Sequence, residues 1–115
     1  MTITIYHNPR CSKSRQTMAL LGERGIEPVI VEYLNSLPDA GQLRQIIDGL
    51  GIPAKKLLRS GEAAFKDLDL GDPGKTDEEI ISAMVANPIL IERPIVVTPK
   101  GVRIGRPPEA ILEIL

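Results

Sequence analysis

The first third of the chain combines short apolar runs with polar connections in a pattern that predicts a β-α-β unit. Thr2 to Tyr6 alternates apolar and polar positions, which predicts a strand. Ser12 to Glu23 contains no proline, and Gly22 and Gly25 supply stop signals, which predicts a helix. The β-branched run at 29–31 predicts a second strand, parallel to the first and buried on both faces.

The middle of the chain has the periodicity of helices. Apolar residues within 43–50 recur at i, i+3, i+4 and i+7, and a glycine follows them. The stretch 55–60 predicts one or two helical turns, and 61–75 predicts a loop. Residues 76–79 have the form of a capping box, so a helix should begin there and end before the Asn-Pro pair at 87–88.

The last quarter predicts an antiparallel hairpin followed by a helix. The apolar runs 95–97 and 102–104 flank a four-residue connection at 98–101. Pro107 and Pro108 suit the first turn of a short terminal helix. The order is then β-α-β, helices, β-β-α, which predicts an α/β fold.

The bulk composition limits the class of protein. A length of 115 residues with 43% hydrophobic and 25% charged residues fits one globular domain, 1–115. The formal net charge of −1 gives no general attraction to nucleic acid or anionic membranes, and no apolar run has membrane-spanning length. The N-terminal stretch does not read as a signal peptide, and the single cysteine indicates a reducing compartment, so we expect the cytoplasm.

Cys11 lies where the first predicted strand gives way to the first predicted helix. Unpaired N–H groups and the positive dipole end at this position favour a thiolate or a bound anion. Cys11 could instead be a small buried hydrophobic residue, but its neighbours are polar or basic, which favours a reactive role. A helix terminus supplies only about 0.3–1 kcal/mol, less than one pKa unit, so cationic partners are needed. The local candidates are His7, Lys13 and Arg15.

Two further observations narrow the chemistry of this cysteine. His7 is the only histidine, and it could equally be a solvated turn residue; one Cys and one His do not make a zinc site, so we expect no metal. Ser14 stands where a dithiol oxidoreductase would carry its second cysteine. A mixed disulfide or adduct on Cys11 would therefore need an external thiol for its resolution.

Segments from the start, the middle and the end of the chain carry a resemblance to a known family. The chain resembles the glutaredoxin-linked arsenate reductases in the segments that carry their signature. These are His7 to Arg15, Leu57-Leu58-Arg59, Asn87 to Pro99 and Gly105 to Glu109. The resemblance covers essentially the whole chain. It implies a thioredoxin-like fold with a mixed four-stranded sheet and a helical insertion at about 36–90.

The resemblance also implies roles for individual residues. Cys11 is the expected nucleophile, with His7 assisting thiolate formation, and Pro94 is expected to follow a cis peptide bond facing the cysteine. The side chains expected to bind the oxyanion are Arg59, Arg93, Arg106, Asn8, Ser14 and Arg15. Guanidinium groups are suited to this because they offer fixed, always-charged forks to tetrahedral anions.

The implied activity is reduction of arsenate to arsenite through a Cys11 adduct. Glutathione is the implied co-substrate, glutaredoxin the implied partner, and no bound cofactor is expected. Two other functions stay open. One is a protein-binding regulator of the Spx type, although such regulators sense oxidation through a Cys-x-x-Cys pair that Ser14 interrupts. The other is a glutathione-dependent monothiol oxidoreductase, whose substrate would not require three arginines. At Lys13 and Gln16 the cysteine loop has a sequence of its own within the family. The resemblance therefore does not determine which oxyanion the site prefers.

Overall fold

The computed structural model describes residues 2–36 and 38–115. Met1 and Leu37, which fall inside the predicted domain 1–115, lie outside the described residues. The chain divides into two compact units, a sheet unit of Met1–Ser36 with Arg93–Leu115 and a helical unit of Leu37–Glu92. The single domain stays a prediction.

The sheet unit is built on four strands drawn from both parts of the sequence. They are β1 (Thr4–Tyr6), β2 (Val29–Val31), β3 (Ile95–Thr98) and β4 (Gly101–Ile104), in the spatial order β2-β1-β3-β4. β1 and β2 are parallel, whereas β1–β3 and β3–β4 are antiparallel. This arrangement confirms the predicted α/β class with a mixed four-stranded sheet.

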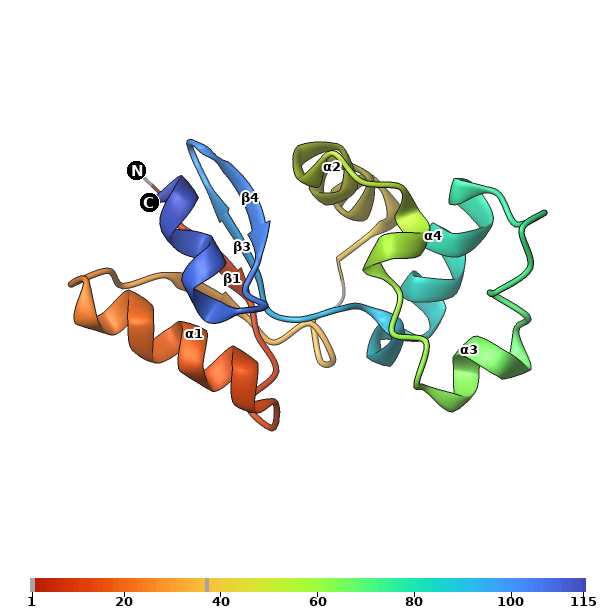
Figure 1. Ribbon diagram of the computed structural model, residues 1–115, viewed down its shortest axis with the longest axis horizontal. Coiled ribbons are helices and arrows are strands. Elements are labelled where there is room, and N and C mark those ends of the chain that lie inside the picture. The colour runs from red at the N-terminus through yellow and green to blue at the C-terminus, as the bar shows by residue number, and fades with distance from the viewer. Residues whose placement is uncertain (1, 37) are drawn as a thin grey trace. The chain divides into compact units, whose positions relative to one another are not determined.

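Two helices complete the sheet unit. The helix α1 (Ser12–Glu23) joins β1 to β2, and the 3₁₀ helix η3 (Pro108–Ile114) follows β4; they lie side by side against the sheet (Figure 1). Leu21 of α1 and Ile111 of η3 are fully buried in one cluster with Ile5 and Val96. Ile5 and Val96 face each other across β1 and β3, so this core begins at the centre of the sheet.

The burial predicted for β2 is wrong. Val29 is 52% exposed and Ile30 is 48% exposed, although both belong to the β-branched run. The reason is the place of β2 at the edge of the sheet, where β1 is its only neighbouring strand. Its side chains therefore lack the two covered faces of a central parallel strand.

The hairpin forms as predicted but with a shorter connection. β3 extends to Thr98 and β4 begins at Gly101, so two residues, Pro99 and Lys100, join the strands in place of the predicted four. The Thr98 hydroxyl accepts the Lys100 N–H at 3.0 Å, and Gly101 has φ +151°, a conformation that favours glycine. These features let the ladder continue one residue further on each strand.

The helical unit contains the helices between β2 and β3. They are α2 (Ala40–Leu50), η1 (Ala54–Leu57), α3 (Ala63–Asp67), α4 (Asp77–Ala86) and η2 (Pro88–Leu90). The predicted stop of α2 at Gly51 is confirmed, because Gly51 is left-handed with φ +67°. The predicted capping box of α4 is confirmed as well, since the Thr76 hydroxyl accepts the Glu79 N–H at 3.2 Å.

Two predictions in the helical unit are wrong in detail. The stretch 61–75 was expected to be a loop but contains α3, a five-residue helix with no buried residue and no side-chain cap. Neither helical periodicity nor a capping signal therefore marks it in the sequence. The helical turn expected to reach residue 60 ends at Leu57, because Leu58 becomes extended and forms a bridge with Ile91.

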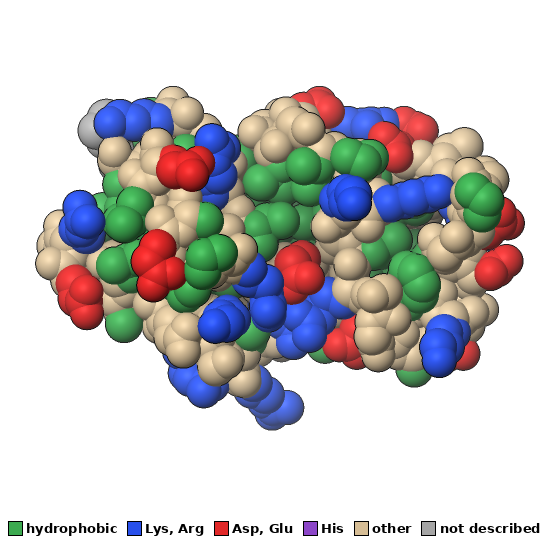
Figure 2. Space-filling view, in the orientation of Figure 1, with side chains coloured by type: hydrophobic (Ala, Val, Ile, Leu, Met, Phe, Trp, Pro, Cys, Tyr) green, Lys and Arg blue, Asp and Glu red, His purple; other side chains and the backbone are tan. Residues whose placement is uncertain are grey.

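The surface carries charge of both signs. Acidic and basic side chains both appear over the face shown in Figure 2, as the near-zero net charge implies. In the part of the chain that the structure describes, no helix combines the length and apolar character that crossing a membrane requires.

Candidate active site

The loop that follows β1 closes onto the first turn of α1 and sets Cys11 at the helix N-terminus. Cys11 is the N-cap residue, with extended backbone angles of φ −92° and ψ 124°. Its N–H donates to the Asn8 carbonyl at 3.0 Å, and its own carbonyl accepts the Arg15 N–H at 3.0 Å. Cys11 is buried, with 9% of its surface exposed, and its sulfur has polar neighbours.

Hydrogen-bond donors surround the Cys11 sulfur. Burial raises the pKa of the thiol, but this is outweighed by hydrogen bonds from the Ser14 N–H, the Arg93 side chain and the Lys13 N–H and by the charge of Arg106. Arg106 Nη2 lies 3.3 Å from Cys11 Sγ. The result is a pKa of Cys11 below the usual value for a thiol, which favours the thiolate nucleophile.

The two arginines at the sulfur are fixed to each other. Arg106 Nε donates to the Arg93 carbonyl at 2.8 Å, and the Arg93 residue is only 9% exposed. The Arg93–Pro94 peptide bond is cis, as the resemblance implies, and the Arg106–Pro107 bond is cis as well. Each arginine therefore precedes a cis-proline, and both guanidinium groups approach the sulfur from the segments that flank β3 and β4.

Ser14 organises the loop from a fully buried position. Its hydroxyl lies 2.5 Å from His7 Nδ1 and accepts the Asn8 N–H at 3.1 Å. Because the serine oxygen already accepts from Asn8, its own proton is available to the histidine nitrogen. The serine that replaces a second cysteine thus links His7 and Asn8 to the first turn of α1.

The surroundings of His7 favour the neutral imidazole. Burial lowers the pKa of His7, the carboxylate of Glu32 raises it and the charge of Arg15 lowers it, with a net fall below the ordinary value. A neutral ring is compatible with a hydrogen bond from Ser14 to Nδ1, which leaves the proton on Nε2. Glu32 was not among the residues singled out from the sequence, because it follows β2 and only the fold brings its charge near His7.

Asn8 and Arg15 support the same loop through backbone groups. Asn8 is 4% exposed, and its Oδ1 accepts the Arg10 N–H at 3.0 Å. The Arg15 guanidinium donates to the Pro9 carbonyl at 3.0 Å. With Ser14, these residues shape the cysteine loop, and their expected contacts with an oxyanion stay predictions.

Gly105 is a site residue whose role depends on a close tertiary approach. A Cβ atom at this position would lie 2.5 Å from Thr17 Oγ1 and 2.8 Å from Pro94 Cγ, so only glycine fits. Its N–H donates to the Pro94 carbonyl at 2.9 Å, which ties the start of the Arg106 segment to the cis-proline. Thr17 is itself fully buried and donates to the Lys13 carbonyl at 2.9 Å.

Arg59 belongs to the helical unit, where it is paired with two carboxylates. Its Nη1 lies 3.0 Å from Glu92 Oε1, and its Nε lies 3.4 Å from Glu62 Oε1. Its N–H donates to the Leu90 carbonyl at 2.8 Å. The other predicted site residues all lie in the sheet unit, so the expected convergence of Arg59 on the oxyanion stays a prediction.

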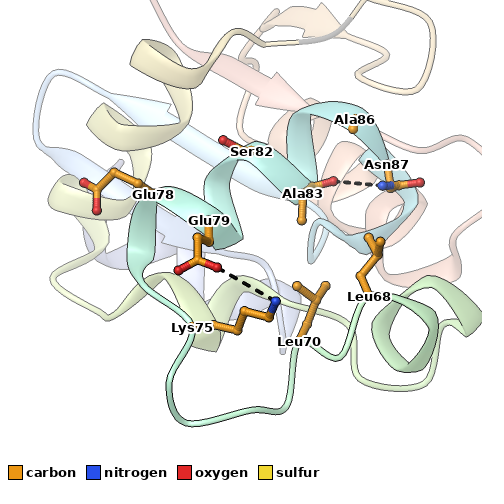
Figure 3. Close-up of a pocket in the computed structure, with 9 residues that line it drawn as sticks. All are labelled: Leu68, Leu70, Lys75, Glu78, Glu79, Ser82, Ala83, Ala86 and Asn87. Carbon is orange, nitrogen blue, oxygen red and sulfur yellow. Dashed lines mark hydrogen bonds and ion pairs between the residues drawn. The ribbon is translucent and has the colours of Figure 1, made fainter.

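The helical unit has a cavity of its own, which the predicted site residues do not line. This cavity of about 490 Å³ lies along α4 and is bordered by Leu68, Leu70, Ala83 and the Lys75–Glu79 ion pair (Figure 3). No thiol or imidazole group lines it. Within residues 2–36 and 38–115, no cluster of three His, Cys, Asp or Glu side chains could hold a metal ion.

The fold and the cysteine site together define a class of protein. A four-stranded mixed sheet, a single acidified cysteine at the N-terminus of α1 and a cis-proline before β3 are the features of a thioredoxin-like protein with one reactive thiol. Residues 6–114 match the model of the ArsC family. The chain belongs to the ArsC family.

Named relatives agree with this assignment. The chain is 47% identical to the arsenate reductase of Rhizobium meliloti (strain 1021), over 100% of this chain and 82% of the relative. It is 52% identical to "Uncharacterized protein YfgD" of Escherichia coli (strain K12), over 98% of this chain and 96% of the relative. The solved structure of the arsenate reductase from Vibrio cholerae superposes with a TM-score of 0.97 at 46% identity, covering 100% of this chain and 98% of that one.

Proposed function

We propose that this protein is an arsenate reductase that forms a covalent adduct between Cys11 and arsenic. The observation that carries the proposal is the Cys11 sulfur itself, with Arg106 Nη2 at 3.3 Å and a pKa held below that of an ordinary thiol. The similarity to proteins named arsenate reductase supports the choice of substrate.

The first step is nucleophilic attack on a multiply charged anion. The Cys11 thiolate forms a bond to the arsenic of arsenate, and one arsenate oxygen is protonated and leaves as water. Arsenic stays pentavalent. Arg93 and Arg106 neutralise the charge on the remaining oxygens, which offsets the repulsion between a thiolate and an oxyanion.

Arg59 would complete the set of guanidinium groups. Its ion pairs with Glu62 and Glu92 are partly exposed, with side chains about a quarter exposed. Exposed ion pairs contribute only about 0–1 kcal/mol, so exchanging one carboxylate for an arsenate oxygen costs little. We infer that Arg59 binds the oxyanion in this way.

Resolution of the adduct needs two external thiols, because the chain has one cysteine. The glutathione thiol replaces a second arsenic-bound oxygen, which leaves as water. A glutaredoxin thiolate then attacks the glutathione sulfur: a disulfide forms, the sulfur–arsenic bond breaks, and its electron pair stays on arsenic, which becomes trivalent. Hydroxide finally displaces the Cys11 thiolate and releases arsenite.

We place this chemistry in the cytoplasm. A reaction that consumes glutathione, and a nucleophile that must stay reduced between turnovers, both require a compartment in which the glutathione pool is reducing. The single unpaired cysteine of the chain is compatible with that location.

The test is a coupled assay of the purified protein with arsenate, glutathione and glutaredoxin. Arsenite production should vanish in Cys11→Ser and fall by about 10²–10³ in Arg93→Ala and Arg106→Ala, as for the loss of an oxyanion donor. Arg103→Ala is the matched control, because Arg103 is an arginine of the same unit that pairs with Glu113. Robust turnover by Cys11→Ser would exclude the mechanism.

Other oxyanions belong in the same assay, because the similarity to YfgD is as high as that to the arsenate reductases. If the protein reduces a different tetrahedral oxyanion, and Cys11→Ser and Arg106→Ala both lose that activity, the site assignment stands and the substrate is that oxyanion. Retention of RNA polymerase by the immobilised protein, with no turnover of any oxyanion, would favour a regulator. Reduction of glutathione mixed disulfides unaffected by Arg93→Ala would favour a monothiol oxidoreductase.

A further inference from the structure

A second cavity of the sheet unit lies beside the cysteine loop. It measures about 320 Å³ and is lined by the loop residues His7, Asn8, Pro9 and Arg10 and, from the segment after β2, by Glu32, Leu34 and Asn35. A volume of this size is at the lower end of the range for small-molecule sites. The mechanism above assigns no role to this cavity.

The loop that leads to Cys11 forms one part of the cavity wall. Four of its lining residues immediately precede Cys11 in sequence, and the Asn8 carbonyl accepts the Cys11 N–H at 3.0 Å. The His7 N–H donates to the Val31 carbonyl at 2.8 Å, which fixes the cysteine loop against the segment that supplies the opposite wall. The cavity therefore lies next to the loop that carries Cys11.

The lining carries one charge of each sign. Arg10 and Glu32 are both exposed, and no ion pair joins them in the described ranges 2–36 and 38–115. Both charges are accessible from solvent, while Asn35 adds amide groups and Leu34 adds an apolar surface that is 39% exposed. This set suits a small zwitterion with a short aliphatic part.

We propose that this cavity binds glutathione, with its ammonium group at Glu32 and one carboxylate at Arg10. Glutathione has charges that match this lining, because it carries an ammonium group and a carboxylate at one end and a second carboxylate at the other. The inference rests on the proposed function, because it identifies where the thiol that attacks the Cys11 adduct is held before reaction. It assigns Arg10, Glu32 and Asn35 to the binding of glutathione. This role is separate from the binding of the oxyanion by the arginines.

Binding of S-methylglutathione to the full-length protein tests this directly, since the blocked thiol cannot react. Titration followed by amide chemical shifts should perturb His7, Asn8, Arg10 and Glu32. Glu32→Gln and Arg10→Gln should each raise the Kd about 2- to 5-fold, the effect of an exposed ion pair. Glu27→Gln and Arg24→Gln, equal charge changes at exposed sites in the same unit, should leave it unchanged.

A modified ligand identifies the partner of Glu32. N-acetyl-S-methylglutathione lacks the ammonium charge, so it should bind wild type and Glu32→Gln with equal affinity. Shift changes confined to residues outside the cavity, or a Kd unaffected by both cavity variants, would overturn the assignment.

The coupled assay separates this inference from the proposed function. If wild type reduces arsenate and the KM for glutathione is the same in Arg10→Gln and Glu32→Gln, the cavity assignment fails and the function stands. If S-methylglutathione binds in the cavity as described but no arsenate is reduced, the function fails and the cavity remains a glutathione site.

Discussion

At the scale of single residues, the Cys11 sulfur is stabilised by donors of two origins. The N–H groups of Lys13 and Ser14 come from the first turn of its own helix, whereas the guanidinium groups of Arg93 and Arg106 come from segments far along the chain. By itself the first set has only a small effect, because a helix terminus supplies less than one pKa unit. The remote arginines therefore supply part of the acidity of the thiol.

Arg106→Ala should raise the pKa of Cys11, because it removes a positive charge and a donor at 3.3 Å from the sulfur. The thiolate is lost as the pH falls through this pKa, so the loss should move to higher pH in the variant. The pH dependence of alkylation by iodoacetamide measures the shift. Arg103→Ala, with the same change in charge, should leave the curve in place.

Ser14→Ala should destabilise the protein by about 1–3 kcal/mol, because it leaves His7 Nδ1 and the buried Asn8 N–H without their shared partner. Urea denaturation measures the free energy of unfolding. Ser12→Ala is the control, since Ser12 is an exposed serine in the same helical turn and should change stability by less than about 0.5 kcal/mol. Equal effects of the two substitutions would contradict the role of Ser14.

Sequence reasoning pointed to Cys11 but only to some of the groups around its sulfur. The polar neighbourhood of Cys11 and its place before a helix were visible in the chain, and both hold in the structure. The cationic candidates near Cys11 in sequence include His7, whose pKa is lowered by burial, and Lys13, whose N–H donates to the sulfur. Arg106 stands 95 residues from Cys11, and only the family resemblance pointed to it.

At the scale of elements, the cysteine helix is positioned by a close approach of two segments. Gly105 packs against Thr17 of α1 and against Pro94, with no space for a side chain. This contact joins the helix that carries Cys11 to the segment that carries Arg106. The spacing between the sulfur and the guanidinium group therefore depends on a glycine that neither binds nor reacts.

Gly105→Ala should lower stability by about 1–3 kcal/mol, the usual cost of overpacking, because its Cβ would stand 2.5 Å from Thr17 Oγ1 and 2.8 Å from Pro94 Cγ. The pKa of Cys11 should rise as well if Arg106 is displaced. Gly22→Ala in α1, where the added carbon meets nothing within 4 Å, should instead stabilise the protein by up to about 1 kcal/mol. Thermal and urea unfolding compare the two variants.

Helix ends that are set by nearby residues were predicted well. Features that depend on contacts with distant parts of the chain were not. The bounds of α1 and the capping box of α4 follow from residues within a few positions of each helix end. The exposure of β2 depends on its edge position, which its own apolar sequence does not encode. The short helix α3 lacks both a cap and a buried face, so no sequence signal separates it from a loop.

At the scale of the whole molecule, the sheet unit is assembled from two distant parts of the sequence. β1 and β2 come from the first 36 residues, whereas β3, β4 and η3 follow residue 92. Ile111 of η3 is fully buried against Ile5 and Leu21, so the C-terminal helix closes the core beneath the N-terminal strand. Stability of the cysteine loop therefore depends on packing by residues that are remote in sequence.

Ile111→Ala should destabilise the sheet unit by about 2–5 kcal/mol, the range for a large-to-small change in a packed core. Ile89→Ala is the matched control, because Ile89 is 36% exposed in η2 and should change stability much less. Hydrogen exchange at the amides of β1 reports the unfolding of the sheet unit. Equal protection in both variants would show that η3 does not support the sheet.

The dependence of the sheet unit on both parts of the chain has a consequence during synthesis. The ribosome makes Cys11 early, but β3 and the two arginines emerge only after the whole helical unit has been translated. A nascent chain that stops short of Arg93 lacks the guanidinium groups that favour the thiolate. Its sulfur is consequently less acidic than in the finished protein, so a smaller fraction of it is thiolate at neutral pH.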